Sequence, residues 1–161
     1  MIFKTKKHNS NFYNKLLILS RNLFFYNKLT FKDTFETRIY LMFMHFAIIL
    51  KIYKDKKTNF PQVEYDNLFK CIENDLRELA FGDVAVNKKM KDLNKIFYNI
   101  LLKFFQNSKD FKINRDLVFL YFNQINNDKY DLFNEYFISF YHFCFELGVN
   151  NMIKDIQTFK V

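Results

Sequence analysis

Apolar residues recur every three or four positions along most of the chain, which is the spacing of amphipathic helices. The pattern predicts helical segments at about 11–29, 33–57, 61–79, 87–104, 117–125 and 129–147, with a short last helix near 152–156. No internal repeat, heptad run or second domain interrupts this series. We therefore expect an all-α fold, a single compact domain of about six to seven helices in a non-repeat bundle that spans residues 1–161.

The segment from Asp33 to Lys54 is apolar on most sides, which is typical of a central helix. Asp33 precedes Glu36 by three residues, a spacing that resembles a capping box with Asp33 as the cap. His45 lies between Met44 and Phe46 in this segment, so we expect a core histidine that hydrogen-bonds a neighbouring group.

Gly82, one of only two glycines, marks a corner between two helical segments. We expect Leu79 to close the core stripe of the helix before it and Gly82 to provide a positive-φ C-cap for that helix. Asp83 or Asn87 can then cap the next helix. The corner has two interpretations, a structural turn or a tight loop that presents fixed charges to a partner.

Three lysines, Lys88, Lys89 and Lys91, follow the corner in the first turns of the expected helix. Cations near a helix N-terminus oppose the macrodipole and cost about 0.3 to 1 kcal/mol each. Because local stability does not explain these lysines, we expect a partner or an acidic neighbour.

Composition narrows the choice of partner without deciding it. The 161 residues include 23 Phe and 10 Tyr but only two Gly and one Pro, which argues against an all-β fold and against dinucleotide-binding loops. The net charge of +8 favours polyanionic partners such as ribosomal RNA or an anionic membrane surface, although AT-rich codon usage produces the same bias. We expect residues 1–9 to form a flexible basic N-terminus.

No catalytic or metal-binding motif is evident, and we expect no cofactor and no small-molecule substrate. His8, His45 and His142 are far apart, and Cys71 and Cys144 are expected to be buried, reduced thiols. Asp75 and Glu78 share a helix face, which is more typical of a solvated surface than of acid-base catalysis. The longest uncharged apolar run, residues 39–50, is too short to span a bilayer, so we expect no transmembrane helix.

Two blocks of the sequence, 33–54 and 74–98, together resemble the ubiquinol-cytochrome c chaperone family. The matching residues are Asp33, Thr34, Arg38, His45, Leu76, Arg77, Glu78, Gly82, Asp83, Val86, Lys88, Lys89, Met90 and Tyr98. The chain departs from the family pattern at Asn87, where a proline is usual, and at Ala80 and Phe81. The C-terminal third matches only in being helical.

The resemblance implies a non-enzymatic assembly factor for the cytochrome bc1 complex of the respiratory chain, which attends newly made cytochrome b. Mitochondrial relatives work near the ribosomal exit with a small helical partner. A chain without a presequence looks like a bacterial member, which works in the cytoplasm, peripheral to the inner membrane; a eukaryotic member would work in the mitochondrial matrix.

Expected site residues fall into two groups. Partner binding is expected at Arg77, Asp83, Lys88, Lys89 and Lys91, and a structural role at Gly82, Asp33, Arg38 and His45. Two other functions stay open at this point. One is a basic helical ribosome- or RNA-binding protein with no bc1 client, and the other is an enzyme that uses Asp75, Glu78 and His45.

Overall fold

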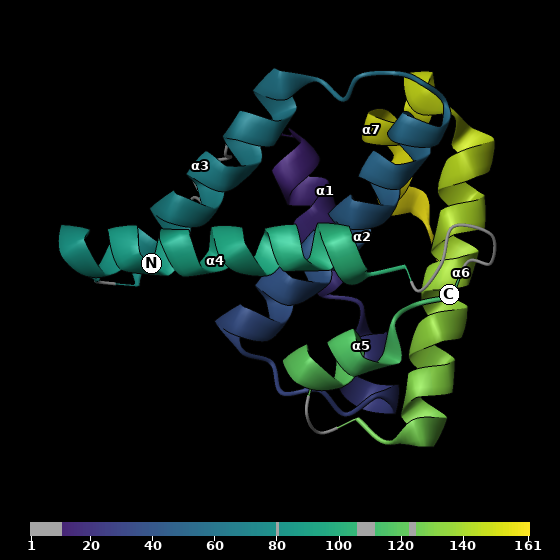
Figure 1. The fold of residues 1–161 in the computed structure, drawn as a ribbon, viewed down its shortest axis with the longest axis horizontal. Coiled ribbons are helices and arrows are strands. Elements are labelled where there is room, and N and C mark those ends of the chain that lie inside the picture. Colours follow the sequence, from purple (N-terminus) through teal and green to yellow (C-terminus); the bar gives the residue numbers. More distant parts are fainter. Residues whose placement is uncertain (1–10, 80, 106–111, 123–124) are drawn as a thin grey trace.

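Helix α2 (Phe35–Asp55) runs through the middle of the molecule, crossed by α4 and flanked by α6 (Figure 1). The computed structural model describes residues 11–79, 81–105, 112–122 and 125–161. Every residue from Leu41 to Ile49 is buried, as expected for a helix that is apolar on most sides. The prediction of a central second helix is confirmed.

The fold is all-α, as predicted, and the described residues form no strand. The other elements are α1 (Asn11–Ser20), the π-helical turn η1 (Phe24–Lys28), α3 (Gln62–Glu78), α4 (Asp83–Lys103), α5 (Arg115–Tyr121), α6 (Asn127–Leu147), α7 (Val149–Asp155) and the 3-10 turn η2 (Ile156–Thr158). Helices α1, α4, α6 and α7 pack on α2. Helix α3 packs on α1 and α4 and also meets α2 through the stacked rings of Phe43 and Phe69. Among the described residues, no helix combines the length and the apolarity that a bilayer crossing requires.

Aromatic side chains make up much of the core around α2. Phe46 stacks on Phe97 of α4 with ring centroids 5.4 Å apart, and Phe12 of α1 contacts it edge-on at 5.3 Å. Near the chain ends, the Lys15 ammonium of α1 donates hydrogen bonds to the carbonyls of Ile153 (2.8 Å) and Lys154 (2.6 Å) at the end of α7. These contacts join the first and last helices around α2.

The first helix is shorter than predicted, because α1 ends at Ser20 instead of continuing to Leu29. The Ser20 hydroxyl donates to the Leu17 carbonyl (2.9 Å), and the Asn22 side chain accepts from the backbone N–H of Phe24 (3.0 Å). Polar side chains that bond the local backbone compete with helical hydrogen bonds. The periodicity of the apolar residues continues through this break, which is why the sequence pattern did not reveal it.

The cap of α2 is Thr34, so the prediction that Asp33 caps this helix is wrong. The Thr34 hydroxyl accepts from the backbone N–H of Thr37 (3.2 Å). Asp33 lies one residue too early for this role and instead pairs with Arg38, at 3.7 Å between Nε and Oδ1. Threonine and aspartate both cap helices well, so adjacent candidates cannot be ranked by residue type.

The two glycines end up in different roles. Gly148 has a φ of 73° and ends α6. Gly82 has a φ of −66° and a ψ of 162°, and it precedes the first residue of α4, so the prediction of a positive-φ C-cap for α3 is wrong. The last turn of α3 is ended by Leu79, whose backbone N–H donates to the Asp75 carbonyl (3.1 Å). Extended backbone suits an N-cap, and residues other than glycine adopt it without strain.

Candidate functional site

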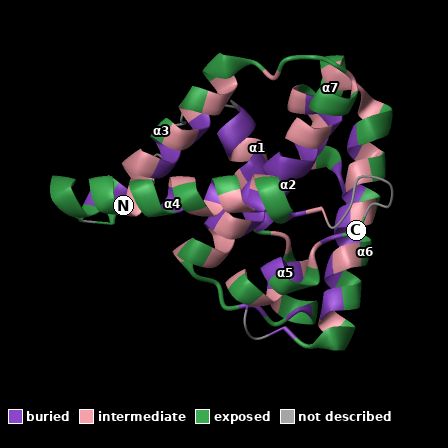
Figure 2. Cartoon of the chain, in the orientation of Figure 1, coloured by how far each residue is buried: buried purple, intermediate pink, exposed green. Residues whose placement is uncertain are grey.

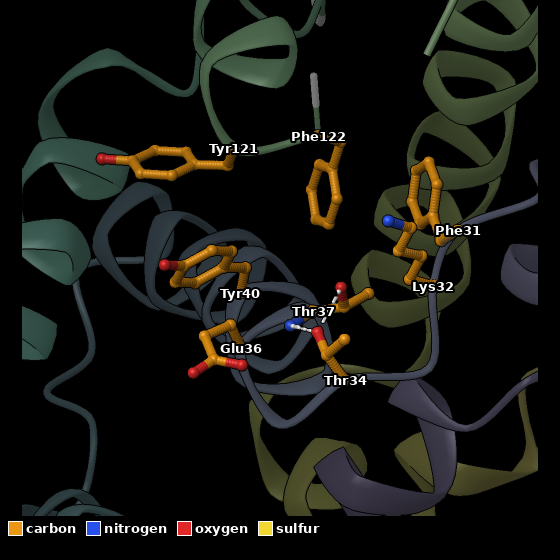
Figure 3. A pocket seen from close by; sticks show the side chains of 8 residues that line it. All are labelled: Phe31, Lys32, Thr34, Glu36, Thr37, Tyr40, Tyr121 and Phe122. Carbon is orange, nitrogen blue, oxygen red and sulfur yellow. Dashed lines mark hydrogen bonds between the residues drawn. The ribbon is translucent and has the colours of Figure 1, made fainter. Parts of the chain in front are cut away.

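Two adjoining cavities open over the N-terminal half of α2, and they share Glu36 and Tyr40. The first has a volume of about 200 Å³ and is lined by Phe31, Lys32, Thr34, Glu36, Thr37, Tyr40, Tyr121 and Phe122 (Figure 3). The second has a volume of about 300 Å³ and is lined by Phe35, Glu36, Tyr40, Leu76, Leu79, Phe81, Lys89, Asp92, Leu93 and Ile96. We call the two cavities together the Tyr40 groove.

The walls of the Tyr40 groove are held by specific contacts. The Phe31 and Phe122 rings stack at 4.5 Å with an interplanar angle of 2°. The Asn99 amide of α4 donates to the Tyr121 hydroxyl at the end of α5 (2.8 Å). Figure 3 shows the Tyr40 and Tyr121 rings one above the other, with centroids 5.2 Å apart. Contacts between protein side chains therefore hold the aromatic wall of the first cavity.

The charged groups of the groove lie around apolar walls. Lys32 and Glu36 belong to the first cavity, and Glu36, Lys89 and Asp92 belong to the second, so neither cavity has a large charge of one sign. Burial raises the pKa of the Tyr40 hydroxyl, with smaller contributions from the Glu36 carboxylate and the neighbouring Tyr121. Tyr40 is thus a neutral hydrogen-bond donor at physiological pH.

The second cavity ends at two exposed apolar side chains. Leu79 is 53% exposed and Phe81 is 37% exposed. The prediction that Leu79 belongs to the core is wrong, because α3 ends immediately before it and the chain turns away. The Lys89 ammonium lies 4.7 Å from the centroid of the Phe81 ring, a cation–π contact that covers one face of the ring. These residues give the groove an apolar rim at the corner between α3 and α4.

Two of the predicted partner-binding residues interact with each other at this corner. The Arg77 guanidinium donates to the Asp83 carboxylate and also to the Glu73 carboxylate, the latter at 3.0 Å. Gly82 lies between the two helices that this ion pair joins. Arg77 and Asp83 thus link the end of α3 to the first residue of α4, and their charges neutralise each other.

The three predicted lysines divide between two sides of α4. Because α4 begins at Asp83, Asn87 is inside the helix, and its predicted capping role is wrong. Lys88 and Lys89 therefore lie in the second turn and Lys91 in the third, where the macrodipole effect has faded. Lys89 faces the Tyr40 groove, whereas Lys88 and Lys91 are exposed and line neither cavity.

The residues considered for catalysis do not share a site. His45 is fully buried, and its two ring nitrogens lie 2.6 Å from the Leu41 carbonyl and 2.8 Å from the Tyr136 hydroxyl. Asp75 accepts a hydrogen bond from the Tyr13 hydroxyl, and Glu78 is exposed. None of the three lines the Tyr40 groove. His45 is a hydrogen-bonded core histidine, as predicted, and Cys71 and Cys144 are buried free thiols.

Comparison with known families decides the family of the chain. A family model described as ubiquinol-cytochrome C chaperone matches residues 27–116, more than half of the sequence. The chain belongs to this family. The match includes α2, α3, α4 and every residue that lines the Tyr40 groove except Tyr121 and Phe122. Neither a curated protein nor a solved structure matches the chain.

Family membership assigns a general role. The protein is related to chaperones of ubiquinol-cytochrome c reductase, so it has a role in the assembly of the cytochrome bc1 complex. The Tyr40 groove was missed at the level of the sequence. The signal that could have indicated it is the pair Leu79 and Phe81, which are large apolar residues next to a helix end and a glycine.

Proposed function

We propose that the protein is a non-enzymatic chaperone that holds newly made cytochrome b through the Tyr40 groove, at the membrane face where this subunit inserts. Two findings support the proposal. The chain belongs to the ubiquinol-cytochrome C chaperone family, and the groove lies almost wholly in the matching segment. Cytochrome b is the hydrophobic client that best suits a groove with apolar walls and an exposed apolar rim.

The size of the groove suggests how it holds a client. One turn of a helix, about 10 Å wide and 5.4 Å high, fills roughly 400 Å³, which is more than either cavity. Each cavity instead has room for side chains that project from a helix lying across it. Because Tyr40 separates the cavities, the client would insert apolar side chains on both sides of this ring, at i and i+3, i+4 or i+7.

The exposed rim supplies the favourable free energy of this contact. Leu79 and Phe81 leave apolar surface in water that a bound segment would cover. Covering a leucine or phenylalanine fully contributes about 1.5 to 3 kcal/mol. Lys89 already lies over Phe81, so it can move aside or cover the client's outer face with its aliphatic stem.

The test replaces the exposed apolar side chains of the rim and measures cytochrome b and bc1 activity. In a host strain in which the gene is deleted, the double variant Leu79→Ser, Phe81→Ser should fail to restore cytochrome b and bc1 activity. Loss of the two contacts should weaken capture of cytochrome b by the tagged protein about tenfold or more. Both side chains are exposed, so the free energy of unfolding should change by less than about 1 kcal/mol.

A matched control uses Ile18→Ser, Val63→Ser, because both residues are exposed apolar side chains that do not line the groove. This variant should restore bc1 activity fully. Normal cytochrome b and bc1 activity in the deletion strain would refute the proposed client. Equal loss with both double variants would refute the Tyr40 groove as the binding site.

A further inference from the structure

Helix α4 has an outward face that no other described element covers (Figure 2). Its residues follow one another at alternating steps of four and three: Val84, Lys88, Lys91, Lys95, Tyr98 and Leu102. At 3.6 residues per turn they fall within an arc of about 80°. We call this stripe the outer α4 face. The side of α4 that carries Val86, Leu93, Phe97 and Ile100 is buried against the core.

The outer α4 face carries charge of one sign. Lys88, Lys91 and Lys95 are exposed, and within the described part of the chain none of them has an ion-pair partner. Of the nearest acidic residues on the helix, Asp83 pairs with Arg77, and Asp92 lines the Tyr40 groove and forms no ion pair with these lysines.

Two lysines near the end of α2, Lys51 and Lys56, are less available than those of the outer α4 face. Lys51 pairs with Asp55 at 3.3 Å and lies 5.1 Å from the centroid of the Phe105 ring. The Lys56 ammonium donates to the Phe145 carbonyl (3.0 Å) and lies 4.4 Å from the centroid of the same residue's ring. The three lysines of the outer α4 face are therefore better candidates for contact with a polyanion than Lys51 and Lys56.

Apolar side chains at both ends of this lysine run distinguish between polyanions. Val84 is 86% exposed, Leu102 is 82% exposed and Tyr98 is 58% exposed. A nucleic acid backbone would attract the lysines but would gain nothing from Val84 or Leu102. An anionic bilayer surface suits both the lysines and the apolar side chains, because lysines bind headgroups while aliphatic and tyrosine side chains enter the interfacial layer.

We propose that the outer α4 face docks flat on a membrane surface rich in anionic lipid. The stripe from Val84 to Leu102 is about 27 Å long, and its lysines can extend to the headgroups while the flanking apolar residues insert. Lys89, Asp92 and Ile96 lie on the adjacent side of the same helix and line the Tyr40 groove. Docking therefore places the groove beside the bilayer. This consequence extends the proposed function. Only the identity of the client rests on that proposal.

Vesicle binding by the purified full chain tests the docking surface and needs no cytochrome b. We expect the protein to float with vesicles of phosphatidylcholine and phosphatidylglycerol, and not with vesicles of phosphatidylcholine alone. Each lysine near an anionic surface raises the binding constant roughly fivefold. The variant Lys88→Gln, Lys91→Gln, Lys95→Gln should therefore bind the anionic vesicles about 100-fold more weakly. Val84→Ser, Leu102→Ser should also weaken binding, at unchanged net charge.

A matched control removes three other exposed lysines, Lys28, Lys54 and Lys70, by the same change to glutamine. This control has the same net charge as the triple variant of the outer α4 face and should bind anionic vesicles like the wild type. Equal weakening by both triple variants would overturn the proposal, because binding would then follow net charge alone. Binding to RNA that depends on the three lysines but not on Val84 and Leu102, without vesicle binding, would overturn it in favour of a nucleic acid.

Discussion

The imidazole of His45 is the most deeply buried ionisable group of the α2 core. A carbonyl can only accept, so Nδ1 carries the proton that is donated to Leu41, and Nε2 accepts from the Tyr136 hydroxyl. Burial lowers the pKa of His45 to about 3, and the Leu41 bond offsets this only in part. Because the unfolded chain binds a proton near pH 6.5, the folded state loses stability as the pH falls from 6.5 towards 3.

When the pH falls from 7 to 5, protonation of His45 in the unfolded chain should lower the free energy of unfolding by about 2 kcal/mol. Urea unfolding of His45→Gln, followed by circular dichroism, should show that this dependence on pH is lost, although the variant is less stable at pH 7. The exposed His142 provides the control, because His142→Gln should keep the wild-type dependence. A His45→Gln variant with the wild-type slope would contradict the assignment.

The sequence around His45 predicts half of its environment. Met44 and Phe46 place it in a buried segment, and Leu41 lies one helical turn before it. Tyr136 is 91 residues away in the chain, and nothing local to His45 indicates this partner. Hydrogen bonds between distant segments depend on how the helices pack, which periodicity does not encode.

At the scale of helices, the two glycines give a matched pair of predictions. Gly148 has a φ of 73° and a ψ of 162°, a conformation that costs other residues about 1 to 3 kcal/mol. Gly148→Ala should therefore lower the free energy of unfolding by about that amount in urea denaturation. Gly82 has a φ of −66°, and an added Cβ would have no heavy atom within 4 Å. Gly82→Ala should cost less than about 1 kcal/mol, so a loss equal to that of Gly148→Ala would contradict the observed corner.

Helices were predictable from the sequence, whereas their ends were not. The period of apolar residues is sampled many times along a helix such as α6, so its existence is well determined. A helix end depends on one or two residues, and the chain offers neighbouring candidates: Asp33 beside Thr34, and Gly82 and Asp83 before Asn87. The wrong choice of Asn87 moved the expected helix start by four residues, which made Lys88 and Lys89 appear unfavourable to the helix dipole.

At the scale of the molecule, the groove is the feature that the sequence could not reveal. Tyr40 lies in the uncharged apolar run of residues 39–50, so the sequence indicates burial for it just as it does for the neighbours that are buried. Whether such a residue lines a cavity depends on which elements cover it, and α5 covers Tyr40 from a segment about 80 positions further along the chain. The partner-binding role of Arg77, Asp83, Lys88, Lys89 and Lys91 stays a prediction, as do a small helical partner and a ribosome contact.

The segment that matches the family is smaller than the unit that buries α2. Residues 27–116 contain α2, α3 and α4, but α1, α6 and α7 lie outside them. Without those helices Phe46 loses Phe12, and His45 loses Tyr136 and Phe140. Removing the cover exposes a continuous apolar surface between Leu41 and Ile49, at a cost of about 25 cal/mol for each square ångström.

An isolated fragment of residues 27–116 should therefore be helical by far-ultraviolet circular dichroism but should unfold without a cooperative transition and bind a hydrophobic dye. The full chain should show a single cooperative transition in urea under the same conditions. A fragment of residues 11–116 restores α1 and its contact between Phe12 and Phe46 but not the contacts of α6, so its dye binding should be intermediate.

A cooperative transition of the 27–116 fragment near the midpoint of the full chain would mean that the family segment is a folding unit on its own. The chain beyond residue 116 would then serve the walls of the groove, through Tyr121 and Phe122, more than the stability of the core.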